Sequence, residues 1–421
     1  MGERWRELWL ERLRRMPLLA VDWLRHPRRD AFWRHGSVCE DYGQIQAAVL
    51  AVGGWADAYS NAVPRLLKGL SGPRKGIIGP WEHKYPQLAR VGPSIDFLGE
   101  ALHWWDHWLN GEPRDVLEDA DLTAFLLEFK TPSAKLGPRS GRWVGLPHWP
   151  ASEIQHTTLY MGDAGLTSTP GAAGPKAVST PQHLGEACGY FCAGMRIDDE
   201  LPGDQREDDA LSLCFDSKPL DQDMVLLGAP RLKLRFASDK PSALLAVRLC
   251  AVAPDGSSER ITWRPINLTH GQSHAEPSPM IPGRRIDLDI MLNDIGYTVP
   301  AGHRLRLAVS TTYWPMLWSS PEVATVTLYP ESALLSLPQL LDGGSSLEIA
   351  PPEAPRYPTS DRVPGNVTPF TESALIRETA EGGRGAAAQI KPGQNARFRC
   401  VQIDLLKAAT GDAGRQPPVQ P

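Results

Sequence analysis

Residues 75–84 read KGIIGPWEHK, and the organisation of the first part of this 421-residue chain follows from them. The apolar run GIIG predicts a short buried strand, which Gly79 and Pro80 end in a turn. His83 follows directly after that turn. A core strand needs no histidine at its exit, whereas a catalytic base needs a rigid strand behind it and a loop on which to sit. The role of His83 therefore depends on what the rest of the chain supplies.

The flanking segments predict a parallel α/β arrangement. Upstream, IQAAVLAVGG (45–54) is an apolar run stopped by two glycines, which is typical of a buried parallel strand, and YSNAVPRLLKGL (59–70) predicts a helix. Downstream, a helix is expected with Ser94 as N-cap and Gly111 as its stop. Its expected apolar face consists of Ile95, Leu98, Leu102, Trp105 and Leu109. This order implies a βαβ crossover, although two strands are too few for an independent domain.

Each predicted parallel strand is followed by a polar side chain suited to acid–base chemistry. Asp57 comes after the strand in 45–54, and His83 comes after the strand in 75–79. Because ligand sites in open α/β sheets lie outside the carboxyl ends of the strands, we expect the two side chains to lie side by side. A carboxylate on one imidazole nitrogen leaves the other free to take a proton from a nucleophile. The alternatives are a surface histidine beside a turn and an aspartate that only caps backbone.

The pattern changes to period two after about residue 115. Half-buried antiparallel strands are expected at RLKLRF, RIDLDI and RLRLAVS (304–310), and APDGSSE (253–259) predicts a hairpin turn. GLTSTPGAAGPKAVSTPQ (165–182) is expected to be a loop. Many short strands with Gly/Pro turns predict a sandwich or jelly roll.

Composition excludes several classes of protein. The charged fraction is 22% and the formal net charge is −5, so nothing favours nucleic acid or an anionic membrane as a partner. The sequence contains no run of eighteen apolar residues, so no membrane span is predicted. The Arg-rich N-terminus contains three glutamates and lacks the apolar core of a signal peptide. A cytoplasmic location is favoured.

Cofactor sites are not predicted. Of six scattered cysteines only Cys188 and Cys192 lie close together, and no second ligand pair follows, so we expect buried or half-buried thiols and no metal. The acidic stretch 196–209 matches no calcium loop and is expected to be solvated.

Several motifs together resemble a known family. LAVGGWADAYSN, GIIGPWEHKYP and EALHWWDHWLNG, followed by a β region with PDGSSERITW, are similar to the serine hydrolases of the CocE/NonD group, which belong with the Xaa-Pro dipeptidyl-peptidases of peptidase family S15. The resemblance implies that Asp57 and His83 are the acid and base of a Ser-Asp-His triad. It implies an α/β plus all-β fold: the C-terminal part of an α/β-hydrolase domain with cap helices, then a jelly-roll (galactose-binding-like) β-sandwich.

The expected divisions of the chain follow from the same comparison of motifs. They are a remnant of the helical cap (1–44), the C-terminal part of the hydrolase domain (45–115), the jelly-roll domain (116–410) and a disordered tail (411–421).

The sequence departs from the family pattern in one respect. The family's nucleophile sits in a Gly-x-Ser-x-x-Gly elbow, and no such elbow occurs here; Ser60 and Ser71 are better interpreted as cap or turn residues. We therefore expect the back part of such a hydrolase, inactive alone, cleaving an ester, amide or dipeptidyl substrate only when complete. An N-terminal complementary chain and a homo-oligomer are left open as partners. The alternative is a non-catalytic binding or structural protein built around the jelly roll.

Three aromatic residues near the two loops are candidates for substrate binding. Trp55 and Trp81 flank the Asp57 and His83 loops, and Tyr59 lies where the resemblance places a pocket aromatic. The alternative is core packing, which we prefer for the tryptophans of the helix, at positions 104, 105 and 108.

Overall fold

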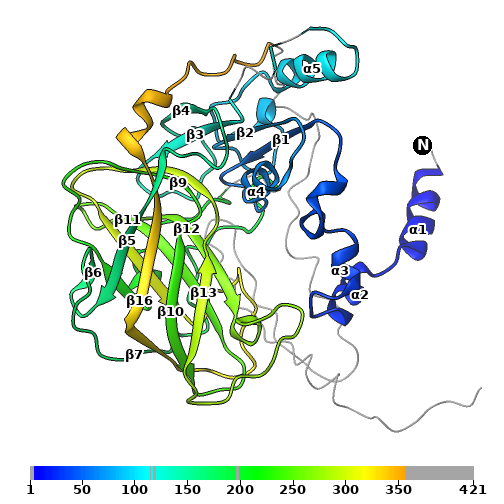
Figure 1. The fold of residues 1–421 in the computed structure, drawn as a ribbon. Helices are drawn as coiled ribbons and strands as arrows, with labels where there is room; N and C mark the ends of the chain where they lie inside the picture. The colour runs from blue at the N-terminus through cyan, green and yellow to red at the C-terminus, as the bar shows by residue number, and fades with distance from the viewer. Residues whose placement is uncertain (1–3, 114, 117–119, 196–198, 357–421) are drawn as a thin grey trace, which may run out of the picture. The chain divides into compact units, whose positions relative to one another are not determined.

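The structure, a computed structural model, describes residues 4–113, 115–116, 120–195 and 199–356, which lie in the compact unit Met1–Asp361 (Figure 1). The predicted tail at 411–421 lies outside the described residues. The α-helices of the described part are α1 (Trp5–Arg15), α2 (Leu19–Arg25), α3 (Ala31–His35), α4 (Ala62–Gly69), α5 (Phe97–Trp108) and α6 (Arg206–Ala210). No helix in these ranges is both long and apolar enough to cross a membrane.

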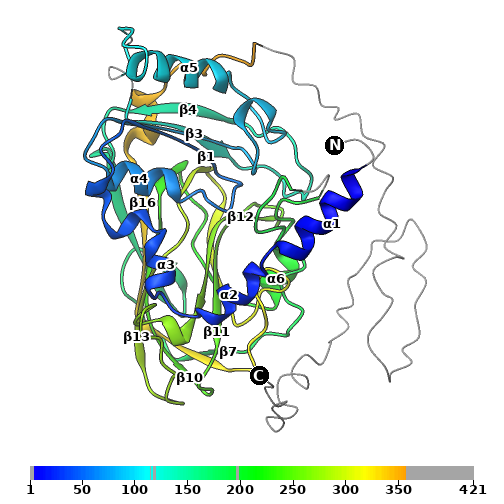
Figure 2. The ribbon, with the colours of Figure 1, turned by 90° about the vertical axis from the view of Figure 1, so that its right-hand side faces the viewer.

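Three parallel strands begin the main sheet. β1 (Val49–Gly54) pairs with β2 (Arg74–Gly79), and β2 pairs with β3 (Leu122–Glu128). Figure 2 shows α4 and α5 on opposite faces of this part of the sheet, as expected when successive crossovers cover both faces. Gly76 allows α4 to approach closely, because a Cβ there would lie 2.6 Å from Leu67 and 2.9 Å from Val63. The predicted parallel arrangement is thus present.

The main sheet continues beyond residue 115 without a break. β14 pairs with β3 in parallel, and every later pairing along the order β1-β2-β3-β14-β9-β16-β10-β13 is antiparallel. The remaining strands of this path are β9 (Met224–Gly228), β10 (Arg231–Ser238), β13 (Ile286–Met291), β14 (Ile295–Val299) and β16 (Val326–Leu340). Strands paired beside the path are β4 (Gly141–Leu146), β5 (Ile154–Gly162), β6 (Gly165–Thr167) and β7 (Lys176–Val178).

A second, four-stranded sheet packs against the first. Its order is β12 (Ser258–Asn267), β11 (Leu244–Val252), β15 (Arg304–Ser310) and β8 (Leu213–Asp216). One buried apolar cluster contains residues of both sheets, among them Ile77 of β2, Leu232 of β10 and Leu249 of β11. The antiparallel strands predicted from alternation are confirmed, as is the hairpin turn, since Val252 pairs with Ser258.

Some sequence predictions were wrong in their details. The run 45–54 forms a strand only from Val49, and the predicted loop 165–182 contains the short strands β6 and β7. The helix expected from Ser94 starts at Phe97, where the side chain of Asp96 accepts a hydrogen bond from the Gly99 backbone. Asp96, which lies directly before the first helical residue, is therefore the N-cap in place of Ser94.

The apolar stripe expected on α5 is largely exposed. Ile95 is buried, but Leu98, Leu102, Trp105 and Leu109 have exposed fractions between 43% and 74%, while Trp104 is buried at 1%. The predicted apolar face is therefore not covered by the described residues, and the core packing expected for Trp104 and Trp105 is confirmed for Trp104 and wrong for Trp105.

The acidic stretch 196–209 is not a solvated loop where the structure describes it. Glu200, Asp208 and Asp209 are all buried, with exposed fractions of 0–3%. Asp209 pairs with Arg248 at 3.0 Å, and the backbone amide of Gly185 donates to Asp208 at 2.8 Å. Buried carboxylates with partners of this kind hold loops in place.

Candidate functional site

The loops after β1 and β2 leave the sheet side by side. The backbone amide of Trp55 donates to the carbonyl of Gly79 at 2.9 Å, and that of Ala56 donates to Trp81 at 3.1 Å. Gly54 makes this approach possible, since a Cβ there would lie 2.1 Å from the Trp81 carbonyl oxygen. The two loops are therefore joined by backbone contacts before either presents a functional side chain.

Asp57 and His83 meet at the ends of these loops. His83 Nδ1 lies 2.9 Å from Asp57 Oδ2, and Asp57 Oδ1 accepts a hydrogen bond from the Tyr59 amide at 2.9 Å. Because an ionised carboxylate only accepts, Nδ1 carries the proton of this bond and Nε2 is left as the basic nitrogen. The histidine side chain is 43% exposed and the aspartate 15%. The sequence-predicted pair is thus brought together with the geometry of an oriented base.

The backbone of His83 is held from two sides. Its amide donates to the carbonyl of Ala193 at 2.7 Å. The preceding Glu82 is 1% exposed, and its carboxylate accepts from the backbone amides of Arg90 and Val91, each at 2.9 Å. Gly194 has a φ of +98°, and a Cβ there would lie 2.6 Å from Glu82 Cγ. The loop around residues 189–195 thereby fixes the position of the histidine.

Glu200 in turn fixes that loop. It is fully buried, and its Oε2 accepts from the amides of Gly194 and Met195 at 2.5 and 3.1 Å. Glu82, Gly194 and Glu200 were not predicted from the sequence as residues of the site. Glu82 stands beside His83 in the chain, but the other two lie over a hundred residues away and carry no spacing signal.

Cys192 also reaches the pair. Asp57, His83 and Cys192 each offer one ligand atom, and the three atoms lie within 4.8 Å of one another. Burial raises the pKa of the Cys192 thiol, and the carboxylates of Asp57 and Glu200 raise it further. From the sequence, Cys192 was considered only together with Cys188, four positions earlier.

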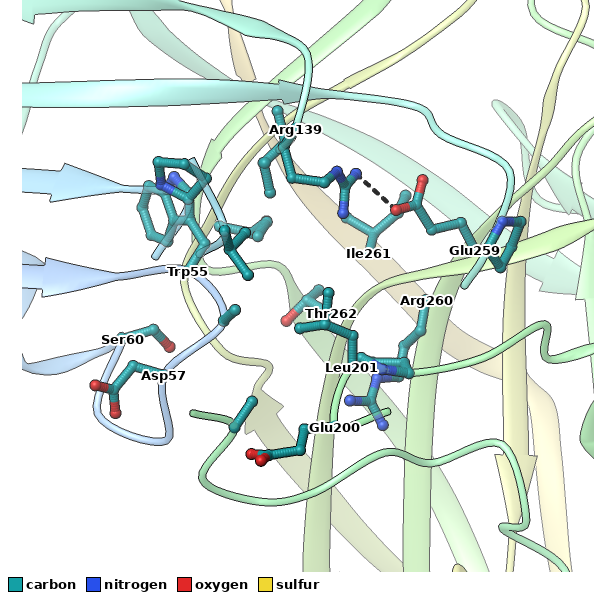
Figure 3. A pocket seen from close by; sticks show the side chains of 18 of the residues that line it. Trp55, Asp57, Ser60, Arg139, Glu200, Leu201, Glu259, Arg260, Ile261 and Thr262 are labelled. Carbon is teal, nitrogen blue, oxygen red and sulfur yellow. Dashed lines mark hydrogen bonds and ion pairs between the residues drawn. The ribbon is translucent and has the colours of Figure 1, made fainter. Parts of the chain in front are cut away.

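A pocket adjoins the Asp57 loop (Figure 3). It is lined by residues of the parallel-strand region and by residues of the β-rich region that follows it. Trp55, Asp57 and Ser60 lie on one side, and Arg139 and Glu259 on another. Arg139 Nη2 lies 2.7 Å from Glu259 Oε1, and the hydroxyl of Tyr297 donates to Glu259 Oε2 at 2.5 Å. These wall charges are already paired, so they shape the pocket more than they supply free charge.

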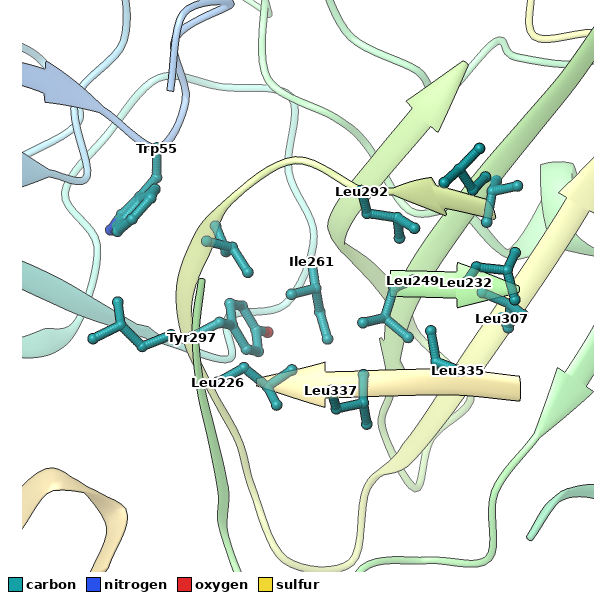
Figure 4. Packing of buried hydrophobic residues seen from close by; sticks show 14 of the residues in the cluster. Trp55, Leu226, Leu232, Leu249, Ile261, Leu292, Tyr297, Leu307, Leu335 and Leu337 are labelled. Carbon is teal, nitrogen blue, oxygen red and sulfur yellow. The ribbon is translucent and has the colours of Figure 1, made fainter. Parts of the chain in front are cut away.

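The three predicted substrate-binding aromatics occupy different places. Tyr59 is 64% exposed, with its ring centroid 5.8 Å from that of His83. Trp55 lines the pocket but is 8% exposed, donates from Nε1 to Phe125, and belongs to the buried cluster shown in Figure 4. Trp81 is 1% exposed and donates to Pro93, so it packs in the core and does not line this pocket.

The serines near the pair do not form a triad. Ser60 is 3% exposed and its amide lies in the Asp57 turn, 3.4 Å from the Asp57 carbonyl oxygen. Within the described ranges, the hydrogen-bond partner found for the His83 ring is Asp57.

These features define a class of protein: parallel strands with an Asp–His pair at their carboxyl ends, continued into a β-rich region. Residues 123–345 match the family described as the X-Pro dipeptidyl-peptidase C-terminal non-catalytic domain, and residues 2–85 match the X-Pro dipeptidyl-peptidase (S15 family). The chain therefore belongs to the CocE/NonD hydrolases of the S15 family and corresponds to their C-terminal part.

Individual relatives agree with this assignment. The chain is 20% identical to cocaine esterase of Rhodococcus sp. (strain MB1 Bresler) over 330 residues, which cover 72% of this chain and 55% of the esterase. An aminopeptidase from a marine sediment Thaumarchaeota archaeon aligns with a TM-score of 0.61 and 19% identity, over 75% of this chain and 59% of its own.

A CocE/NonD family hydrolase of Staphylococcus aureus gives a TM-score of 0.58 at 13% identity, over 77% of this chain and 59% of its own. These structures support the fold. The chain spans about half the length of the curated relatives it matches.

Proposed function

We propose that this chain supplies the acid and the base of a serine hydrolase that cleaves ester or amide bonds through an acyl-serine intermediate. Asp57 orients His83, and His83 Nε2 takes the proton of the nucleophile and later returns it to the leaving group. The single observation that carries this proposal is the 2.9 Å bond between residues at the ends of adjacent parallel strands. Membership of the S15 family supports it.

We further propose that the serine and the oxyanion donors are not in this chain. No Gly-x-Ser-x-x-Gly elbow occurs in its 421 residues, and an Asp–His pair without a nucleophile forms no acyl-enzyme. The chain alone is then inactive. Two features favour a complementary segment as partner: β1 is the end strand of the main sheet among the described residues, and the apolar stripe on α5 is exposed.

A second candidate is a non-catalytic binding or structural role for the β-rich region, which we propose to be a jelly-roll sandwich. One observation favours it, because the family matched over residues 123–345 is described as non-catalytic. The first candidate accounts better for the oriented histidine, which a binding domain does not need.

Four experiments test the proposal. The DNA upstream of the Met1 codon, translated in all frames, should encode the missing elbow, and the two segments expressed together should hydrolyse p-nitrophenyl esters or X-Pro-p-nitroanilides. His83→Ala should then lower kcat by at least about a thousandfold. The 421-residue chain alone should not be labelled by a fluorophosphonate probe.

Three results would contradict the proposal or one of its parts. Stable labelling of a serine in the chain alone would overturn the claim that it lacks a nucleophile. Hydrolysis that survives His83→Ala would overturn the role of the base. If no such elbow is encoded upstream, the non-catalytic binding role would be favoured over the hydrolase.

A further inference from the structure

Three side chains with metal-binding atoms gather at one point from three separate loops. Asp57 follows β1, His83 follows β2, and Cys192 comes from the loop that precedes α6. One atom of each lies within 4.8 Å of the other two, and His83 Nδ1 lies 2.9 Å from Asp57 Oδ2. No other such group is found among the described residues.

The donor set and its spacing suit a zinc-type ion. Zinc takes nitrogen, sulfur and carboxylate oxygen at about 2.0–2.3 Å in a tetrahedron, which places ligand atoms about 3.3–3.7 Å apart. The 2.9 Å between His83 Nδ1 and Asp57 Oδ2 lies just below that range, and the 4.8 Å within which all three atoms fall lies above it. The three atoms are therefore close enough to share one ion once the side chains adjust. Sites with three protein ligands keep the fourth position for water.

The charges around Cys192 also favour a cation. Besides Asp57, the carboxylate of Glu200 lies near the thiol. Glu200 is fully buried, and its Oε1 has no hydrogen-bond partner among the described residues. Figure 3 shows this carboxylate extending from its backbone toward the side of the pocket where Asp57 lies. A buried carboxylate oxygen without a donor is costly, and a nearby divalent ion reduces that cost.

The same charges argue against Cys192 as a substitute nucleophile. A thiolate between two carboxylates is repelled by both, whereas reactive cysteines lie in electropositive surroundings. A metal ion reverses this balance, because its positive charge stabilises the thiolate that binds it.

We propose that Asp57, His83 and Cys192 bind a divalent zinc-type ion, with water as the fourth ligand, and that the bound ion blocks proton transfer by His83. Binding forms bonds from the ion to the Cys192 sulfur and to His83 Nδ1. The Cys192 proton is released to the solvent, and the Nδ1 proton moves through solvent to Nε2, which can then no longer accept a proton. The ion replaces the Asp57–His83 hydrogen bond, so the imidazole is no longer oriented toward a nucleophile. The binding step stands without the proposed function, whereas the inhibitory step rests on it.

Cobalt(II) provides the direct test, because a thiolate ligand gives a charge-transfer absorption band in the near ultraviolet. The full chain, freed of metal by a chelator, should develop this band on titration with Co²⁺, and Zn²⁺ should abolish it. Cys192→Ser should lose the band and weaken Zn²⁺ binding, measured by calorimetry, by at least about 100-fold. Asp57→Asn should keep the band and weaken binding, which tests the site in a second variant.

Matched controls remove a cysteine and a histidine elsewhere. Cys39 is exposed, and His274 forms an exposed pair with His270, with the two Nδ1 atoms 3.4 Å apart. Cys39→Ser and His274→Ala should leave the band and the affinity unchanged. A band that persists in Cys192→Ser, or the lack of any band in the wild-type chain, would overturn the metal site. In the reconstituted hydrolase, metal binding that leaves the rate unchanged would overturn only the inhibitory step.

Discussion

The Asp57–His83 pair and the cluster around Arg248 both join carboxylates to nitrogen bases, yet their surroundings differ. Arg248 is fully buried and bonds Asp209 at 3.0 Å and Ser212 at 2.8 Å, with Asp208 at 3.6 Å. His83 is 43% exposed and its ring bonds one carboxylate. A charge buried among several partners holds the fold together, whereas a half-exposed base with one orienting partner can gain and lose a proton.

The largest effect on stability should come from breaking the buried cluster. Arg248→Met removes the cation while Asp208 and Asp209 stay buried, so we expect a loss of about 3–5 kcal/mol in the free energy of unfolding, measured with urea. Arg235→Met is the matched control, because Arg235 bonds Asp287 on an exposed strand face. Its unfolding midpoint should stay near that of the wild type. Equal losses in the two variants would contradict the contrast drawn between the regions.

Asp294 provides a case between the two regions, because it is buried without an ion-pair partner among the described residues. Burial raises its pKa to about 6. The folded chain therefore holds the proton more tightly than the unfolded chain, and the stabilisation present below about pH 4 is lost as pH rises through 6. Asp294→Asn should be more stable than the wild type by about 2–3 kcal/mol at pH 8 and equal to it at pH 4.

Asp287→Asn serves as the control of opposite sign. The hydrogen bond from Arg235 lowers the pKa of Asp287, so its contribution is present at neutral pH and lost on acidification. A denaturation series across pH that shows the same sign for both variants would rule out the assigned roles of burial and pairing.

The Asp57–His83 pair and several strands could be predicted from the sequence, whereas the buried cluster around Arg248 could not. Asp57 and His83 were found because each lies just after an apolar strand, and parallel strands place their ends together. The alternation in 231–236 and 304–310 likewise predicted two strands, β10 and β15. Local periodicity and strand exits are properties of short stretches and can be identified without the fold.

What the sequence could not predict depends on long-range contacts. Glu200 and Asp209 look like members of a solvated acidic run, and only the partners brought by β11 and the 189–195 loop show that they are buried. Cys192 lies 109 positions beyond His83, and no spacing rule links them. The apolar face predicted for the helix after Ser94 is largely exposed among the described residues, which helical periodicity alone does not reveal.

A smaller effect on stability is expected at Gly194, where the loop before α6 packs against the segment that carries His83. Gly194→Ala adds a Cβ at a φ of +98°, 2.6 Å from Glu82 Cγ and 3.1 Å from the His83 amide. We expect a loss of about 1–3 kcal/mol in the free energy of unfolding and a shift of the His83 imidazole resonances in NMR spectra. Gly283→Ala is the matched control, because Gly283 also has a positive φ, +77°, but its Cβ would meet no atom within 4 Å. An unshifted His83 in the first variant would show that Gly194 does not position the histidine.

The smallest effect on stability should come from the functional pair itself. Asp57→Asn keeps the shape of the side chain but turns an obligate acceptor into a group that can also donate, so Nδ1 of His83 no longer needs to carry the proton. We expect an unfolding midpoint close to that of the wild type, because the histidine is exposed and holds little else together. The imidazole nitrogen resonances should nevertheless report a changed tautomer, and in the reconstituted hydrolase kcat should fall by about 10⁴. A variant that lost stability without changing its tautomer would instead assign Asp57 to the structural class of carboxylates represented by Asp209.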